Sequence, residues 1–218
     1  MRYLQSAFLS ICVITSITLV TMYASTPANA QNKPRLSNVI GEAIQKDNFY
    51  PRVKLITSMG DIVIELRRDR APATVNNFLM YVKEQAYNGT LFHRVIADYI
   101  VQGGGYDKDM KELDAKYSIV NESGNGLKNN HYTVAMARML NPHSAKRQFF
   151  FNMKDNDNLN PGRQWGYTVF GEVVEGQDIV DAMSLVSTHI DPQTGLPDTP
   201  VEDIVLQRIS ILPEPSFE

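Results

Sequence analysis

Short runs of β-branched and aromatic residues, separated by turn-forming residues, recur along the chain after residue 51. The first two runs, residues 53–57 and 62–66, flank a turn that contains Gly60, which is the pattern of a β-hairpin. Later runs of the same character predict further short strands. These runs cover residues 91–96, 99–102, 133–137, 148–152, 167–174 and 204–212.

Two segments have a helical period instead. Between residues 71 and 84 the apolar side chains recur at helical spacing, and Pro72 lies where a first helical turn tolerates proline. A second amphipathic helix is predicted over residues 177–186. Many short strands with two isolated helices are atypical of alternating βαβ units. The pattern therefore favours an all-β fold, either an antiparallel barrel or a sandwich.

The first thirty residues differ in composition from the rest of the chain. Arg2 is their only charged residue, residues 7–20 are apolar with Ser and Thr interruptions, and residues 28–30 read Ala-Asn-Ala. This pattern predicts a secretory signal peptide that is removed after Ala30, with export to the periplasm. An uncleaved membrane anchor is the alternative, because the apolar stretch approaches the ~20 residues needed to cross a bilayer.

Cleavage at this place would leave a chain that begins at Gln31 and lacks Cys12, the only cysteine. No disulfide could then form, and stability must come from the core. Cys12 follows the bulky Ile11, where lipoprotein processing needs a small residue, so we do not expect lipidation. The expected parts are a signal peptide (1–30), an N-terminal extension (31–51), one domain (52–213) and a C-terminal tail (214–218).

Composition and charge exclude several classes of protein. The 218 residues are 43% hydrophobic and 21% charged, which is ordinary for a globular protein and unlike a disordered chain or a protein with many membrane spans. The 21 Lys and Arg residues are balanced by 24 Asp and Glu residues. The chain therefore lacks the basic footprint of a nucleic-acid binder, and we expect no nucleic-acid partner.

Three segments place aromatic or aliphatic side chains beside a few polar ones. They are residues 92–96, residues 99–105, and residues 136–138 together with 148–151. If these side chains face one cavity, they form a groove with apolar walls and few directed hydrogen-bond donors. Residues 106–131 have no strong periodicity, and we expect this long segment at the rim of the groove.

In order and residue type these motifs resemble the cyclophilins, a family of eight-stranded barrels that isomerise peptidyl-prolyl bonds, and most resemble its periplasmic bacterial branch. The similarity runs from about Arg52 to Pro213 and includes the Phe-His-Arg-Val-Ile, Gln-Gly-Gly-Gly, Met-Ala, Gln-Phe-Phe and Val-Phe-Gly motifs. It implies a closed barrel of eight antiparallel strands capped by two α-helices. It also implies an isomerase without cofactor or metal that acts on unfolded or partly folded proteins containing X-Pro bonds. We expect a monomer, which would contact a membrane only if the leader stays uncleaved.

The resemblance implies roles for individual residues. Arg94 matches the catalytic arginine, Gln102 the residue that holds its guanidinium, and Phe150 the floor of the proline pocket. The remaining matches line the pocket (Tyr99, Ile100, Leu159 and Tyr167) or bind the substrate backbone (Ala137, Arg138 and Gln148).

Two positions depart from the family pattern. Asn158 stands where many eukaryotic members have a tryptophan, and Tyr167 stands where they have the pocket histidine. We therefore expect weak cyclosporin binding. Catalysis should be unaffected, because neither position supplies the guanidinium of the catalytic arginine, Arg94.

The reaction itself requires no nucleophile. Resonance gives the amide a rotation barrier of ~18–20 kcal/mol, and an isolated X-Pro bond turns over in tens to hundreds of seconds. In the twisted amide the nitrogen lone pair leaves conjugation and can accept a hydrogen bond. A permanently protonated guanidinium such as Arg94 would bind that nitrogen best midway through rotation, which is differential binding of the transition state.

Several of these residues also have purely structural interpretations. An arginine on a strand is usually solvated or ion-paired, and only the neighbouring Gln102 and aromatic residues favour a catalytic role for Arg94. Strand alternation assigns Phe149 or Phe151 to the core and Phe150 to the groove. It also turns His93 away from the Arg94 face, so a structural role is expected for His93.

Two other functions remain open at this stage. A binding module of the same fold would hold extended Pro-containing segments without turnover, and an Arg94→Ala variant distinguishes it from an enzyme. An unrelated secreted β-barrel would bind a small apolar ligand, and a ligand that co-purifies with the protein would indicate it.

Overall fold

A computed structural model describes residues 42–214 of the chain, which all belong to the unit Pro34–Glu218. The predicted signal peptide, residues 31–41 of the predicted extension and residues 215–218 of the predicted tail lie outside the described residues. A helix long and apolar enough to span a bilayer is not found among residues 42–214.

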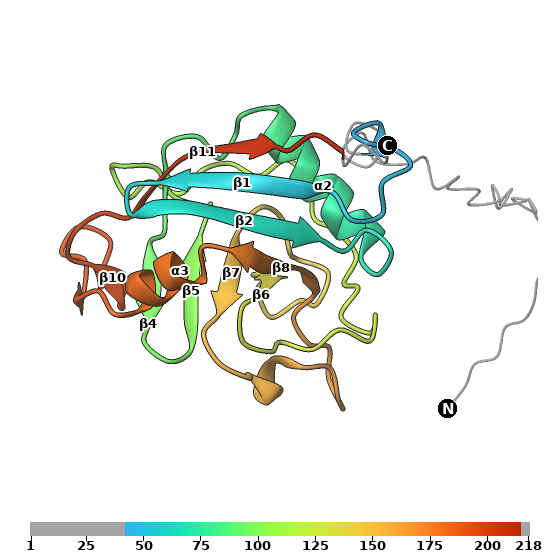
Figure 1. Ribbon diagram of the computed structural model, residues 1–218. Helices are drawn as coiled ribbons and strands as arrows, with labels where there is room; N and C mark the ends of the chain where they lie inside the picture. Colours follow the sequence, from blue (N-terminus) through green and yellow to red (C-terminus); the bar gives the residue numbers. More distant parts are fainter. Residues whose placement is uncertain (1–41, 215–218) are drawn as a thin grey trace, which may run out of the picture. The chain divides into compact units, whose positions relative to one another are not determined.

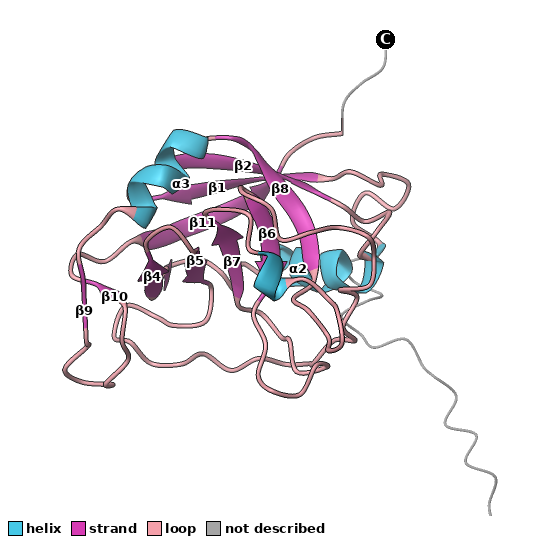
Figure 2. Ribbon diagram, turned by 90° about the horizontal axis from the view of Figure 1, so that it is seen from below, coloured by secondary structure: helices cyan, strands magenta, loops and turns pink. Residues whose placement is uncertain are grey.

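Antiparallel strands between residues 52 and 211 form one curled sheet, drawn in Figures 1 and 2. Its strands are β1 (Arg52–Thr57), β2 (Gly60–Leu66), β3 (Thr90–Leu91), β4 (Arg94–Ile96), β5 (Ile100–Gly103), β6 (Thr133–Met136), β7 (Phe149–Asn152), β8 (Val169–Glu175) and β11 (Val205–Ile211). Their order in the sheet is β3-β11-β1-β2-β8-β6-β7-β5-β4. The predicted hairpin is confirmed, since β1 and β2 pair with Thr57 opposite Gly60.

The described sheet has nine strands, whereas the sequence predicted eight. The difference arises because the segment from Thr90 to Ile96 is split into β3 and β4, which form the two edges of the sheet. Phe92 and His93, between them, are both buried, at 1% and 5% exposure. A regular strand would turn two consecutive side chains to opposite faces. Phe92 and His93 belong to neither strand, and this one segment leads from one edge of the sheet to the other. The described strands thus form a curled, half-barrel sheet with β3 and β4 at its edges.

The helices α2 (Pro72–Lys83) and α3 (Gln177–Ser184) lie at opposite ends of the barrel (Figures 1 and 2). Both helices were predicted from the sequence. Pro72 is the first residue of α2, where its missing N–H costs no hydrogen bond. Phe78 of α2 is fully buried and contacts the rings of Tyr87, Phe149 and Phe170, so this helix completes the aromatic core.

Smaller elements complete the fold around the barrel. They are a 3-10 helix, η1 (Asp157–Leu159), and a two-stranded sheet of β9 (Thr188–His189) and β10 (Thr199–Pro200). The long segment between β5 and β6 is held in place by polar side chains. Glu122, for example, accepts hydrogen bonds from the backbone N–H groups of Ala73 and Thr74 in the first turn of α2.

Residues before β1 also bind the barrel. Arg68, which is 7% exposed, donates hydrogen bonds to the carbonyl oxygens of Ile44, Gln45 and Asn48. Gln45 in turn donates to the carbonyl oxygen of Leu212. Part of the segment expected as an extension is therefore attached to the barrel.

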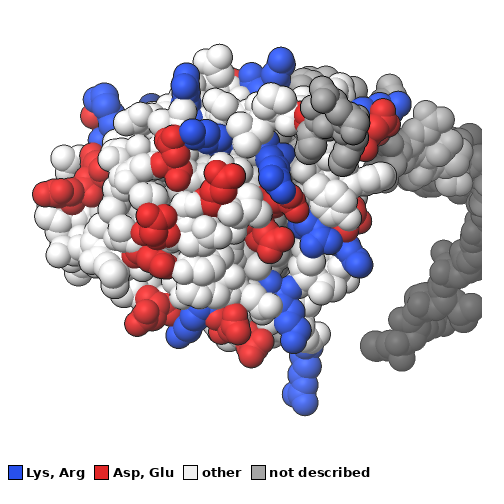
Figure 3. All heavy atoms as spheres, in the orientation of Figure 1, with Lys and Arg blue, Asp and Glu red and all other residues white. Residues whose placement is uncertain are grey.

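Basic and acidic side chains are interspersed over the face drawn in Figure 3.

Candidate active site

Three neighbouring strands, β4, β5 and β7, place the central candidate residues in one row. Arg94 lies opposite Gln102, and Gln102 lies opposite Phe150. Residues opposite each other on adjacent strands turn their side chains to the same face of the sheet. Phe149 and Phe151 alternate to the other face and are fully buried in the main core. Phe150 belongs to a separate apolar cluster, as the alternation of the strand predicts.

A cavity of about 370 Å³ opens over this row. Phe150, which is 2% exposed, is among its most buried apolar residues, and its ring packs edge-on against Tyr167 with the ring centroids 5.7 Å apart. An apolar aromatic surface of this kind suits the carbon atoms of a proline ring. The residues that line the cavity are Arg94, Tyr99, Ile100, Gln102, Ala137, Arg138, Phe150, Leu159 and Tyr167.

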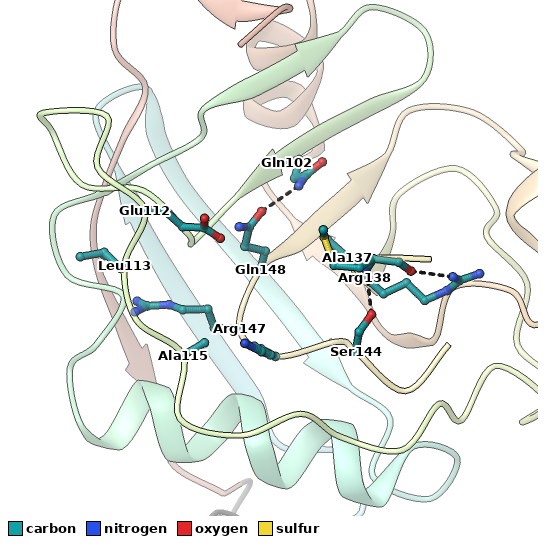
Figure 4. Close-up of a pocket in the computed structure, with 11 residues that line it drawn as sticks. Gln102, Glu112, Leu113, Ala115, Ala137, Arg138, Ser144, Arg147 and Gln148 are labelled. Atoms are coloured by element: carbon teal, nitrogen blue, oxygen red, sulfur yellow. Dashed lines mark hydrogen bonds between the residues drawn. The ribbon is translucent and has the colours of Figure 1, made fainter. Parts of the chain in front are cut away.

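Gln148 is the one predicted site residue that does not line this cavity. It lines an adjacent cavity of about 280 Å³, shown in Figure 4, which shares Gln102, Ala137 and Arg138 with the first. The Gln102 amide donates a hydrogen bond of 2.9 Å from Nε2 to Oε1 of Gln148 (Figure 4). A Cβ atom on Gly105 would lie 2.4 Å from the Gln148 side chain, so any other residue there would displace the Gln148 amide.

Two side chains flank the Arg94 guanidinium. Gln102 lies opposite Arg94 in the sheet, and its bond to Gln148 uses Nε2 and leaves the Oε1 acceptor, so its expected role of holding the guanidinium stays a prediction. An acidic side chain is the second neighbour: Oδ2 of Asp198 lies 3.5 Å from Nε of Arg94. The Arg94 side chain is 38% exposed and lines the cavity over Phe150.

Arg138 stabilises one wall of the cavity. Its guanidinium carbon lies 4.6 Å from the ring centroid of Tyr167, and its N–H groups donate to the carbonyl oxygens of Met139, Trp165 and Gly166. These bonds use three of the five N–H groups of the guanidinium. Binding of the substrate backbone by Arg138, which also lines the cavity, therefore stays a prediction. The ring of Trp165, whose role the sequence left open, is 49% exposed.

Buried asparagines position other parts of the wall, and sequence reasoning did not find them. Asn129, which is fully buried, donates to the carbonyl oxygens of Leu159 and Tyr167. Asn156, at 1% exposure, donates to the carbonyl oxygen of Tyr99. Asparagines are frequent between residues 121 and 160, but nothing local indicates which of them reach the pocket.

His93, the neighbour of Arg94, has the structural environment that strand alternation suggested. Its side chain is 5% exposed, and the centroid of its ring lies 4.4 Å from that of Tyr106. Burial lowers the pKa of His93 from 6.5 to about 4, with a smaller contribution from the nearby Arg94 charge. His93 is therefore neutral at physiological pH. Among residues 42–214, no group of three or more His, Cys, Asp or Glu side chains is placed to hold a metal ion.

This burial predicts an acid-sensitive contribution of His93 to stability. The folded protein keeps His93 neutral down to about pH 4, whereas the unfolded chain protonates it near pH 6.5. The unfolded state therefore binds more protons in this window, and the free energy of unfolding falls as the pH is lowered through it. The loss approaches roughly 3 kcal/mol at the acid end.

Urea unfolding of the wild type and of His93→Phe between pH 7 and pH 4 measures this contribution. We expect a shallower pH dependence in the variant, while His189→Gln, at an exposed histidine, should follow the wild type. Parallel curves for the wild type and His93→Phe would show that His93 does not titrate as its burial implies.

The fold and the cavity together define a class of enzyme, and comparison with known proteins identifies the family. Residues 52–211 match the family model described as cyclophilin type peptidyl-prolyl cis-trans isomerase/CLD. The chain belongs to this family and is a cyclophilin-type peptidyl-prolyl cis-trans isomerase. The family, the barrel fold and the enzymatic activity expected from the sequence are thereby confirmed.

Similar proteins occur in bacteria. The chain is 51% identical over 164 residues to peptidyl-prolyl cis-trans isomerase cyp18 of Streptomyces antibioticus, covering 73% of this chain and 98% of that protein. It is 48% identical over 160 residues to peptidyl-prolyl cis-trans isomerase B of Escherichia coli K12, covering 71% and 96%.

Solved structures agree on the fold. A crystal structure of a cyclophilin-type isomerase from Cryptosporidium parvum superposes with a TM-score of 0.63 at 24% identity, covering 77% of this chain and 100% of that one.

Proposed function

We propose that this isomerase accelerates X-Pro rotation through Arg94 and acts on exported proteins while they fold. The observation that supports the catalytic assignment is the row of Arg94, Gln102 and Phe150 across three adjacent strands. It combines a permanent cation with an apolar aromatic surface in one cavity. A proline ring seated on Phe150 would bring the prolyl nitrogen to the side of the cavity that Arg94 lines.

The mechanism follows from how the two ends of the rotating bond are held. The apolar surface around Phe150 grips the pyrrolidine ring and excludes water, while the polar groups at Gln102, Gln148 and Ala137 hold the flanking chain. The Arg94 guanidinium donates to the prolyl nitrogen only when the twisted amide has released its lone pair. This interaction stabilises the transition state more than either planar isomer, which is the condition for catalysis.

A protease-coupled assay on an X-Pro test peptide tests the catalytic assignment. Wild-type protein and Arg94→Ala are compared for isomerisation, and NMR titration measures binding of the same peptide to both. Loss of turnover with retained binding is the expected result. Unchanged turnover in Arg94→Ala would refute the role of Arg94.

The place of action is proposed from the leader. Residues 1–30 have the composition of a signal peptide, and a folding enzyme delivered to the periplasm would meet newly exported chains in extended form. The boundaries 1–30, 31–51, 52–213 and 214–218 are part of this proposal. Expression of the full chain in a Gram-negative host tests it: intact-mass measurement of the periplasmic fraction should give a protein that begins at Gln31. A full-length, membrane-bound product would indicate an uncleaved anchor.

We also propose a monomer that binds cyclosporin weakly. The amide Nδ2 of Asn158 donates a 3.0 Å hydrogen bond to the hydroxyl of Tyr99, and Tyr167 packs between Phe150 and Arg138. Tyr167 thus forms part of the cavity wall, and Asn158 binds a residue of that wall, where the family pattern has a histidine and a tryptophan.

A further inference from the structure

The acidic neighbour of Arg94 comes from a distant part of the chain. Asp198 lies between β9 and β10, and its Oδ2 is 3.5 Å from Nε of Arg94. The two side chains are similarly exposed, at 37% for Asp198 and 38% for Arg94. Asp198 does not line the cavity over Phe150, so this carboxylate faces the guanidinium from outside the cavity.

The backbone holds Asp198 at this place independently of the ion pair. The carbonyl oxygen of Asp198 accepts a 2.8 Å hydrogen bond from the N–H of Val95, the residue that follows Arg94. The next residue, Thr199, is 4% exposed and lies opposite His189 in the small sheet. Asp198 itself has a φ of 61°, a left-handed conformation that is uncommon outside glycine, asparagine and aspartate. The loop is thus attached to β4 beside the arginine.

We propose that Asp198 is a positioning residue for Arg94. It engages the Nε side of the guanidinium, and the planar fork then directs its terminal N–H groups away from Asp198, toward the cavity. The Nε2 donor of Gln102 is used by Gln148, so Asp198 supplies a charged partner for Arg94 in addition to the neutral Gln102. This inference rests on the proposed role of Arg94 and adds the group that orients it.

The charge of Asp198 is tested with Asp198→Asn. Asparagine tolerates the left-handed conformation, so the variant removes the charge and leaves the backbone unstrained. Because an exposed ion pair is weak, the expected effect is a decrease in kcat of about 2- to 5-fold with KM unchanged. NMR exchange measurements on an X-Pro peptide at several concentrations give kcat and KM separately. Asp203→Asn, at an exposed acid between β10 and β11, serves as the matched control and should leave both constants unchanged.

Two further measurements separate positioning from a general structural effect. The ¹⁵N–¹H signal of the Arg94 Nε–H should show faster exchange with water in Asp198→Asn than in the wild type or Asp203→Asn. In the Arg94→Ala background, Asp198→Asn should have no further effect on kcat, because the group that it orients is gone. Urea unfolding of each variant checks that the folded state is retained.

The outcomes distinguish this inference from the proposed function on which it rests. If Arg94→Ala loses turnover but Asp198→Asn keeps the wild-type kcat, Arg94 is catalytic and the positioning role of Asp198 is wrong. If Asp198→Asn lowers kcat equally with and without Arg94, Asp198 acts by another route and the inference is also overturned. If Arg94→Ala keeps full turnover, the proposed catalytic role itself fails.

Discussion

Replacing Arg94 with alanine is expected to lower kcat/KM for X-Pro isomerisation by about 10²–10³-fold, the usual cost of removing a hydrogen-bond donor directed at the transition state. The expected loss is in kcat, because the guanidinium binds the prolyl nitrogen only when the amide is twisted. The apolar surface around Phe150 stays intact, so peptide binding should change little. Protease-coupled kinetics and NMR titration measure the two quantities.

Two further variants give this prediction its controls. Arg94→Lys keeps the charge but lacks the planar fork, so we expect an activity between those of Arg94→Ala and the wild type. Arg208→Ala removes an exposed arginine on β11, outside the cavity, and should retain wild-type kinetics. If Arg94→Ala and Arg208→Ala lost activity equally, the effect would be one of net charge rather than of the donor at position 94.

The second large effect is expected on stability, at Arg147. This side chain is 5% exposed, and its guanidinium donates to the carbonyl oxygens of Ala86, Gly104 and Asp114. It also lies 5.4 Å and 5.6 Å from the ring centroids of Tyr81 and Tyr87. No carboxylate within the described residues forms an ion pair with it. The backbone carbonyls and the rings therefore compensate its buried charge.

Replacing Arg147 with methionine keeps most of the side-chain volume but leaves these carbonyl groups without their donor. The bond to Gly104 is buried and those to Ala86 and Asp114 are part-buried. An unsatisfied buried acceptor costs about 1–3 kcal/mol, so we expect the free energy of unfolding to fall by about 1–3 kcal/mol. Urea unfolding measures the change, and an unchanged m-value would show that the folded and unfolded states keep their surface areas.

The matched control for Arg147 is its neighbour in the chain. Lys146→Met removes an exposed cation by the same type of substitution and should change the free energy of unfolding by no more than ~0.5 kcal/mol. Arg147→Lys keeps the charge but lacks the fork that reaches three carbonyls, so it should be destabilised by an intermediate amount. Equal stability of Arg147→Met and Lys146→Met would show that water replaces the lost donors.

Local periodicity was sufficient to predict much of the barrel and the orientation of Phe150. The hairpin of β1 and β2, the helix α2 and the outward orientation of Phe150 all depend on repeats of two or 3.6 residues, which a short stretch of sequence contains. The break between β3 and β4 was not predictable in this way. It depends on burying both Phe92 and His93, and only the surrounding core determines that.

The sequence by itself thus determined the family, the barrel class and a set of candidate residues, nine of which line one cavity. Only the tertiary structure decided what holds them. Asp198 faces Arg94, Gln148 binds Gln102, and Asn129 supports Leu159 and Tyr167. The physical reason is that a hydrogen bond or ion pair acts over a few ångströms in space. These residues are far apart in the sequence and come into contact only when the barrel folds, so no short-range sequence pattern predicts the contacts.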